Sequence, residues 1–110
     1  MERSKIGTYI GFCIRARKIA FGVDDAEKQR KGVYLLIADE ELSPNSLKTM
    51  IKTQERLGCP LLISEKGKLA KLTNRPAVKA VSIKDEHLAS AILSALESEP
   101  QFKCYSGGTK

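Results

Sequence analysis

The sequence is poor in aromatic and metal-binding residues and has no long apolar segment. Its 110 residues include no tryptophan, one histidine and three cysteines, and only 5% of them are aromatic. No run of 18 apolar residues occurs, which excludes a membrane-spanning helix. The segment Met1 to Lys5 lacks the apolar stretch and cleavage site of a signal peptide. A cytoplasmic protein with no membrane partner is therefore expected.

The scarcity of cysteine and histidine excludes most metal sites. Cys13, Cys59 and Cys104 are scattered without a Cys-x-x-Cys pair, and His87 is the only histidine. A zinc site needs three or four such ligands at a recognisable spacing. We therefore expect no metal, no cofactor, and cysteines that stay reduced.

Catalytic groups are equally scarce. No serine or cysteine has an assignable base beside it, since His87 stands among acidic residues at the start of a predicted helix. The pair Asp24 and Asp25 is explained more simply by helix capping than by acid–base chemistry. No glycine-rich phosphate loop is present either. The sequence thus predicts a protein that is not an enzyme.

What the sequence does contain is an alternation of amphipathic and buried segments. Helices are predicted at residues 4–20, 24–30, 43–57, 68–72 and 85–97, and strands at 33–38, 60–64 and 78–83. This order predicts an α/β protein, a single-domain three-layer α/β/α sandwich with a small mixed sheet, over residues 1–97. Residues 98–110 show no periodicity and contain Pro100, Gly107 and Gly108, so a flexible C-terminal tail is expected there.

Positive charge is concentrated in two stretches of the chain. The net charge is +6, from 19 basic and 13 acidic residues. Residues 1–20 and 64–84 together hold eleven basic and two acidic residues, a net +9, so the remainder is acidic. If both stretches fold to one edge, they would form a basic surface that contacts the phosphate backbone of a nucleic acid. The alternative is that these side chains are only solvated helix faces.

Three segments carry a resemblance to a known family. The motif Gly22-Val23-Asp24-Asp25-Ala26-Glu27-Lys28, the buried strand 33–38 and the turn Arg75-Pro76-Ala77 resemble the kink-turn RNA-binding ribosomal protein family, the L-seven-Ae/L-thirty-e group. Residues 11–18 are similar to the first helix of the short bacterial members. The resemblance covers about Lys5 to Leu96 and implies an α/β/α sandwich that binds a sharply bent RNA.

The resemblance assigns roles to the residues that open the second helix. In the family, Gly-x-Asn-Glu-x-x-Lys lies at this place. Gly22 would let the backbone approach RNA, Lys28 would reach a phosphate or a guanine acceptor, and Asp25 would accept from guanine N–H groups. Asp24 departs from the family, because an ionised aspartate only accepts hydrogen bonds, whereas asparagine also donates.

A second RNA-binding loop is implied before the last strand of the sandwich. Arg75 would stack on or bond to the nucleotide that is extruded from the kink. Arg75 as a plain surface residue beside a structural proline is the alternative. The remaining residues expected to meet RNA are Lys68, Lys71 and Asn74 near this loop, with Lys68 and Lys71 facing outward, and Arg15 and Lys18 as nonspecific phosphate contacts.

Together these features predict a non-enzymatic RNA-binding protein of ribosomal type that recognises kinked RNA. Its partners would be kink-turn or ribosomal RNA and the ribosome. The alternative is a degenerate member of the family that acts as a protein-interaction module or associates loosely with the ribosome. The pair Asp24 and Asp25 motivates this alternative, because it places two carboxylates where the family contacts the nucleobases of the RNA.

Overall fold

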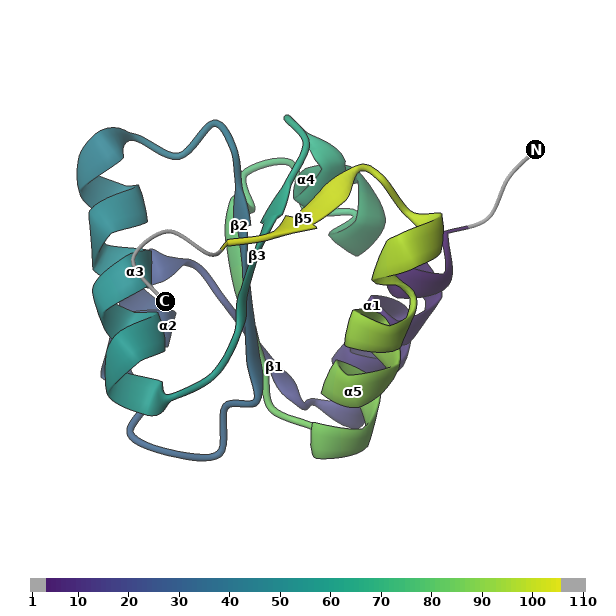
Figure 1. Cartoon of the computed structure of the whole chain (residues 1–110), viewed down its shortest axis with the longest axis horizontal. Coiled ribbons are helices and arrows are strands. Elements are labelled where there is room, and N and C mark those ends of the chain that lie inside the picture. The colour runs from purple at the N-terminus through teal and green to yellow at the C-terminus, as the bar shows by residue number, and fades with distance from the viewer. Residues whose placement is uncertain (1–3, 106–110) are drawn as a thin grey trace.

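The computed structural model describes residues 4–105, in which helices and short strands alternate (Figure 1). In chain order the elements are α1 (Lys5–Ala16), β1 (Ile19–Phe21), α2 (Val23–Lys28), β2 (Leu35–Asp39), α3 (Pro44–Leu57), β3 (Leu61–Ser64), α4 (Lys68–Thr73), β4 (Ala80–Ile83), α5 (Glu86–Ser94), a 3-10 turn (Leu96–Ser98) and β5 (Phe102–Cys104).

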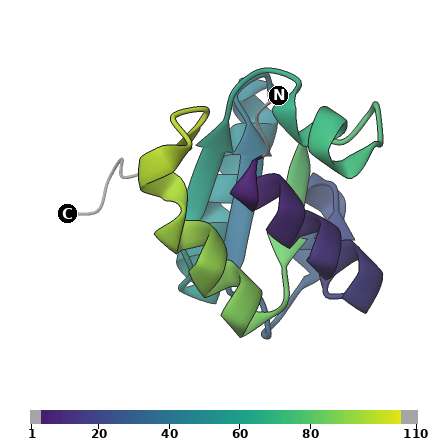
Figure 2. The same ribbon diagram turned by 90° about the vertical axis from the view of Figure 1, so that its right-hand side faces the viewer.

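The five strands form one mixed sheet in the order β1-β4-β2-β3-β5. Strands β2 and β3 are parallel, and the other neighbours are antiparallel. Figure 1 shows the sheet almost edge-on, with α2 and α3 on one side and α1 and α5 on the other. Figure 2, turned by 90°, shows α1 and α5 lying across the front of the sheet. The predicted three-layer α/β/α sandwich is confirmed.

Strand β2 supplies both halves of the hydrophobic core. Leu35 and Ile37 are buried against α1 and α5, whereas Leu36 and Ala38 are buried on the α2 and α3 side. All five of its residues are buried. Successive side chains of a strand point to opposite faces, so a continuous apolar run suits a strand that is covered twice.

Helix boundaries follow the local signals of the sequence. Ser43 caps α3 by accepting a hydrogen bond from the Ser46 N–H at 3.2 Å, and Gly58 ends the helix with a left-handed φ of 69°. Asp85 caps α5 through the Leu88 N–H at 2.8 Å. These start and stop residues are the ones that the sequence indicates.

The first helix is shorter than predicted, because residues 19–21 form strand β1. Helix α1 ends at Ala16, and Arg17 takes a left-handed conformation with φ 59°. The next residues pair antiparallel with β4, Ile19 opposite Ile83 and Phe21 opposite Val81. This pairing joins segments about sixty residues apart, so no local pattern signals it.

The prediction that a flexible tail begins at residue 98 is wrong for residues 98–105. Strand β5 pairs antiparallel with β3, with Phe102 opposite Ser64. Phe102 is 3% exposed within the core, and Glu99 is 5% exposed. Burial of one aromatic ring and the ladder hydrogen bonds outweigh the local signals of Pro100 and low periodicity. The part of the predicted tail at residues 106–110 lies outside the described residues.

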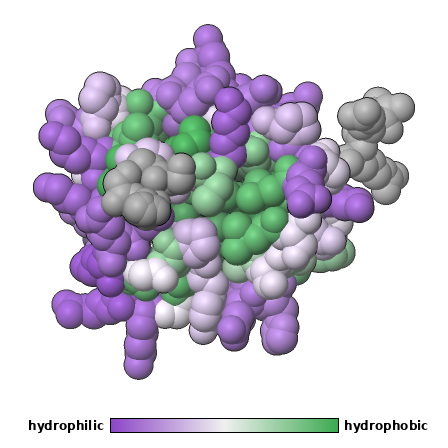
Figure 3. All heavy atoms as spheres, in the orientation of Figure 1, coloured by the Kyte–Doolittle hydropathy of each residue, from purple (hydrophilic) through white to green (hydrophobic). Residues whose placement is uncertain are grey.

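The space-filling view separates apolar and polar regions of one face. In Figure 3 hydrophobic residues gather over the middle of this face, and hydrophilic side chains surround them and project from the lower margin. Among the described residues, no helix is both long enough and apolar enough to cross a membrane.

Candidate nucleic-acid interface

The candidate site residues lie at the two opposite ends of the strands. We call these ends the upper edge and the lower edge of the sheet, after their positions in Figure 1. The upper edge is where β1, β2 and β3 end and β4 begins. It carries the start of α2 and the loop 74–79 that precedes β4. The lower edge is where β1, β2 and β3 begin and β4 ends. It carries residues 17–18, 29–34, 58–60 and 84–85.

At the upper edge the two segments that the resemblance singles out lie in contact. The guanidinium carbon of Arg75 lies 4.2 Å from the centroid of the Phe21 ring, the residue directly before Gly22. The Gly22 N–H donates to the Ala80 carbonyl at 2.8 Å. The pairing of β1 with β4 therefore brings the loop 74–79 against the start of α2.

Gly22 gives the start of α2 an open backbone. Its φ of 95° and ψ of 158° lie in a region that side-chain-bearing residues avoid. A Cβ at this position would meet no atom within 4 Å, so the conformation, and not crowding, requires glycine. No side chain caps the helix. The backbone at Gly22 is thus free to approach a ligand closely.

The charged residues of α2 are all exposed. Asp24 and Asp25 lie in the first turn and Lys28 in the last. Within residues 4–105 none of the three forms an ion pair. The end of the helix is held by Arg56 of α3, whose guanidinium donates to the carbonyl of Glu27 at 2.8 Å and to that of Gln29, the residue after α2, at 2.6 Å. The two carboxylates therefore remain available to a ligand, as acceptors only.

The loop after α4 has a defined shape. Asn74 caps α4 in a left-handed conformation with φ 57°, which asparagine tolerates better than most residues. The Arg75 N–H donates to the Ala70 carbonyl at 3.0 Å, and the Val78 N–H to the Arg75 carbonyl at 3.1 Å. Asn74, Arg75 and Lys71 are exposed. The loop thus presents these side chains from a backbone that is fixed by hydrogen bonds.

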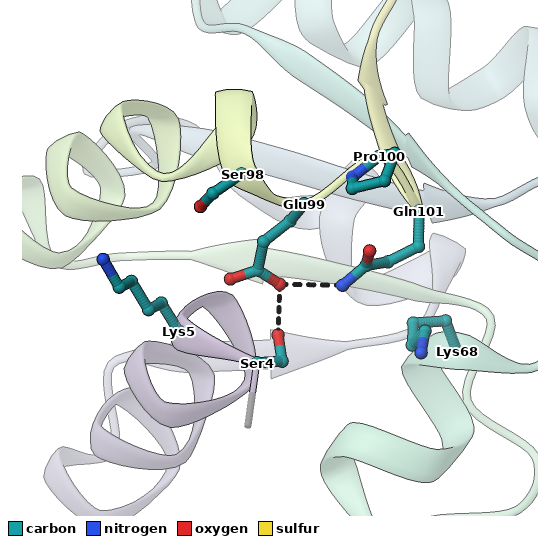
Figure 4. Close-up of a pocket in the computed structure, with 7 residues that line it drawn as sticks. All are labelled: Ser4, Lys5, Lys68, Ser98, Glu99, Pro100 and Gln101. Atoms are coloured by element: carbon teal, nitrogen blue, oxygen red, sulfur yellow. Dashed lines mark hydrogen bonds between the residues drawn. The ribbon is translucent and has the colours of Figure 1, made fainter. Parts of the chain in front are cut away.

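Lys68 does not face outward with Lys71, contrary to prediction. It is half-buried and lines a cavity of about 470 Å³ between the start of α1 and the segment 98–101. Figure 4 shows Ser4, Glu99 and Gln101 at this cavity, with Glu99 hydrogen-bonded to both other side chains. Lys68 thus borders a cavity that Arg75 does not line.

Asp39 holds the end of β2 against the start of α4. In the sequence it is only one of several acidic residues, and no motif marks it. It is 1% exposed at the end of β2. Its carboxylate accepts from the Glu41 N–H at 2.7 Å and from the Gly67 N–H at 2.8 Å. These bonds tie the end of β2 to the residue that precedes α4. In the sequence, the one sign of this role is that an acidic residue directly follows the apolar run 33–38.

Arg15 and Lys18 lie toward the lower edge, away from Gly22 and Arg75. The Lys18 carbonyl accepts from the Lys84 N–H at 2.8 Å. Arg15 lies over the Phe12 ring, 5.0 Å from its centroid. At about 3.3 Å per residue, the strand places Lys18 about 13 Å from Gly22. The basic stretches 1–20 and 64–84 therefore do not converge as a whole on the edge that holds Gly22 and Arg75, and Lys18 and Lys84 meet instead at the lower edge.

The three thiols differ in exposure and acidity. Burial and the nearby Asp85 carboxylate raise the pKa of Cys13 from 9.0 to about 11. Burial also raises the pKa of Cys59. Cys104 is exposed on β5.

A thiol-specific reagent at about pH 8 is therefore expected to modify Cys104 rapidly and Cys13 and Cys59 slowly, because the reacting species is the exposed thiolate. Raising the pH should increase the thiolate fraction of Cys13 only near its raised pKa. Counting labels against time by mass spectrometry checks this, with Cys104→Ser as the control that removes the fast phase. Fast labelling of Cys13 in folded protein would contradict the buried position.

Comparisons with known proteins support the fold alone. No protein-family model matches the chain, and no curated protein does. Among solved structures, a protein of unknown function from Bacillus halodurans C is similar, with a TM-score of 0.76 over 86% of this chain and 99% of that chain. The sequence identity is 15%, so this likeness shows that the two chains share a fold.

Proposed function

We propose that this protein is a non-enzymatic RNA-binding protein of ribosomal type, which recognises kink-turn-like RNA at the upper edge of its sheet. The observation that carries the proposal is the contact of Arg75 with Phe21. It joins the loop 74–79 to the open backbone at Gly22, the two segments that resemble the RNA-binding motifs of the family.

The side chains at this junction suit an extruded nucleotide. One face of the Arg75 guanidinium lies on the Phe21 ring, while the residue stays exposed to solvent. A planar guanidinium that is already oriented can stack on an unpaired base. Asn74 offers both a donor and an acceptor to a base edge. Lys28 and Lys71 supply positive charge for the phosphates on either side.

The acids of α2 would shape the specificity of this site. Asp25 can accept from guanine N–H groups, as the glutamate of the family does in the resemblance. Asp24 cannot donate to a guanine acceptor, and both carboxylates repel nearby phosphates. We therefore expect weaker binding of kinked RNA than an asparagine at position 24 would give.

The proposal predicts that Arg75→Ala weakens binding of a kink-turn RNA by about tenfold, because stacking on one base contributes roughly 1–3 kcal/mol. Lys103→Ala is the matched control, since it removes the same charge from β5 at the other side of the sheet. Fluorescence anisotropy with a labelled kink turn and a straight duplex of equal length, at about 50 and 200 mM salt, measures both affinity and salt dependence.

Two results would overturn the proposal. One is equal affinity of the unmodified protein for the kink turn and the straight duplex at both salt concentrations. The other is an equal loss of kink-turn binding in Arg75→Ala and Lys103→Ala, which would reduce Arg75 to one positive charge among many.

A further inference from the structure

A row of three side chains crosses the lower edge of the sheet. Ile83 pairs with Ile19 on one side and with Leu35 on the other. One step further along the register with β1, Lys84 stands opposite Lys18, and Tyr34 lies next to Ile83 where the pairing with β2 ends. The Lys84 N–H donates to the Lys18 carbonyl at 2.8 Å, and the Tyr34 N–H donates to the Ile83 carbonyl at 2.9 Å, one residue out of the register in which Leu35 faces Ile83.

These three residues belong to the same face of the sheet. Tyr34 borders a cavity that Arg56 and Leu57 of α3 also line. Ala80, which shares the alternation of Lys84, packs on the α2 and α3 side. Ile19 packs against the opposite core, so the alternation places Lys18 with the other two. The row therefore lies on the α2 and α3 side of the sheet.

The row carries an unusual charge arrangement. Two lysines stand opposite each other on neighbouring strands, which destabilises a sheet unless an acid intervenes. Within residues 4–105 the only ion pair joins Lys66 to Glu41, so neither Lys18 nor Lys84 has one there. Asp85, the adjacent acid, accepts from the Leu88 N–H at the start of α5. The two positive charges are thus left for a ligand.

Tyr34 adds an exposed aromatic ring beside these charges. Its side chain is 41% exposed, although it directly precedes a fully buried strand. It borders a cavity of about 360 Å³ that Arg30, Lys31 and Arg56 also line. Arg56 is engaged with carbonyls at the end of α2, whereas Arg30 and Lys31 are exposed. A ring next to basic side chains is the arrangement that binds unstacked bases and their phosphates.

We propose that this lower-edge surface, formed by Lys18, Arg30, Lys31, Tyr34 and Lys84, binds a single-stranded RNA segment. A base stacks on the Tyr34 ring, and neighbouring phosphates lie along Lys18 and Lys84. A duplex fits poorly, because its bases are already stacked and offer no free face to the ring. This surface is separate from the upper edge, so the inference goes beyond the proposed function and shares with it only the class of partner.

The lysines are tested with an oligoadenylate of about eight nucleotides, a length typical of one such site. Lys18→Ala/Lys84→Ala is expected to weaken its binding about tenfold and to reduce the salt slope by about 1.4, for two phosphate contacts to a single strand. Lys48→Ala/Lys103→Ala removes the same charge from α3 and β5, and should change neither quantity as much. Circular dichroism melting verifies that both variants fold.

The ring is tested separately from the charge. Tyr34→Leu is expected to weaken oligoadenylate binding by about five- to a hundredfold, whereas Tyr34→Phe keeps the aromatic face and the affinity. A kink turn without single-stranded ends should bind both variants as it binds the unmodified protein. The lower-edge variants are read with the oligoadenylate and Arg75→Ala with the kink turn, so failure of one surface is distinguishable from failure of the other.

The inference is overturned if the unmodified protein does not bind the oligoadenylate at about 50 mM salt. Equal weakening by the lower-edge and control lysine pairs would also overturn it, as would equal affinity of Tyr34→Leu and Tyr34→Phe. Loss of oligoadenylate binding in the lower-edge variants alone supports it, whatever the outcome at the kink turn.

Discussion

Asp24→Asn is expected to tighten binding of kink-turn RNA by about ten- to a hundredfold. The substitution restores a donor at the exposed first turn of α2, where the family that this chain resembles has asparagine. A good contact to a base edge contributes on the order of 1–3 kcal/mol, which converts to this change in affinity. It also removes one negative charge that repels nearby phosphate.

The charge effect and the donor effect are separable. Glu27→Gln removes the same charge from the same helix, at another exposed position. We expect it to tighten binding only slightly and equally for kinked and straight RNA. Titration of both variants with a labelled kink turn and a straight duplex measures the difference. An equal gain in the two variants would leave no role for the asparagine donor.

Absence of kink-turn binding even in the Asp24→Asn protein would favour the alternative function, a protein-interaction or loosely ribosome-associated module. Two exposed carboxylates without an ion pair among the described residues are consistent with such a surface. The alternative therefore depends on the same two residues that weaken base recognition.

Glu99→Ala is expected to lower the free energy of unfolding by about 2–4 kcal/mol. The Glu99 carboxylate is 5% exposed and accepts from the Ile6 N–H at 2.9 Å, from the Ser4 hydroxyl and from the Gln101 amide at 2.8 Å. It thereby adds to the N-cap Ser4 a second acceptor for the start of α1, from a residue that is more than ninety positions away. Hydrogen bonds to a charged group each contribute about 1.5–3 kcal/mol, and the truncation leaves their donors unpaired.

Chemical denaturation followed by circular dichroism measures this loss. Glu97→Ala removes an exposed acid two residues earlier and should change stability by less than about 0.5 kcal/mol. Glu99→Gln keeps the shape and one acceptor, so an intermediate loss is expected. Equal stability of the Glu99→Ala and Glu97→Ala proteins would mean that the hydrogen bonds between Glu99 and the start of α1 do not stabilise the fold.

Much of the helix–strand order is determined by local signals. Ser43 and Gly58 bound α3 because a hydroxyl can satisfy a free N–H and a glycine can turn left-handed. The apolar run of β2 indicates a strand that is buried on both faces. Each signal acts within a few residues, so a reading of the sequence recovers these elements and the layered fold.

The two edge strands, β1 and β5, could be recognised only from the tertiary structure. Strands β1 and β5 have three residues each, too few for a periodic pattern, and they form only because β4 and β3 offer them partners. Glu99 appears in the sequence as one acid in a polar stretch, while the fold makes it a second acceptor at the start of α1, beside the N-cap Ser4. Such partners lie far apart along the chain, and their energy exists only when the sheet is assembled.

The candidate sites divide in the same way. The sequence by itself determined that positive charge is concentrated in two stretches, and that Gly22, Asp24 and Arg75 stand in motif-like surroundings. Only the tertiary structure decided that Arg75 meets Phe21 at one edge, while Lys18 meets Lys84 at the other. The reason is that strand register sets which charges become neighbours, and register depends on pairing between distant segments.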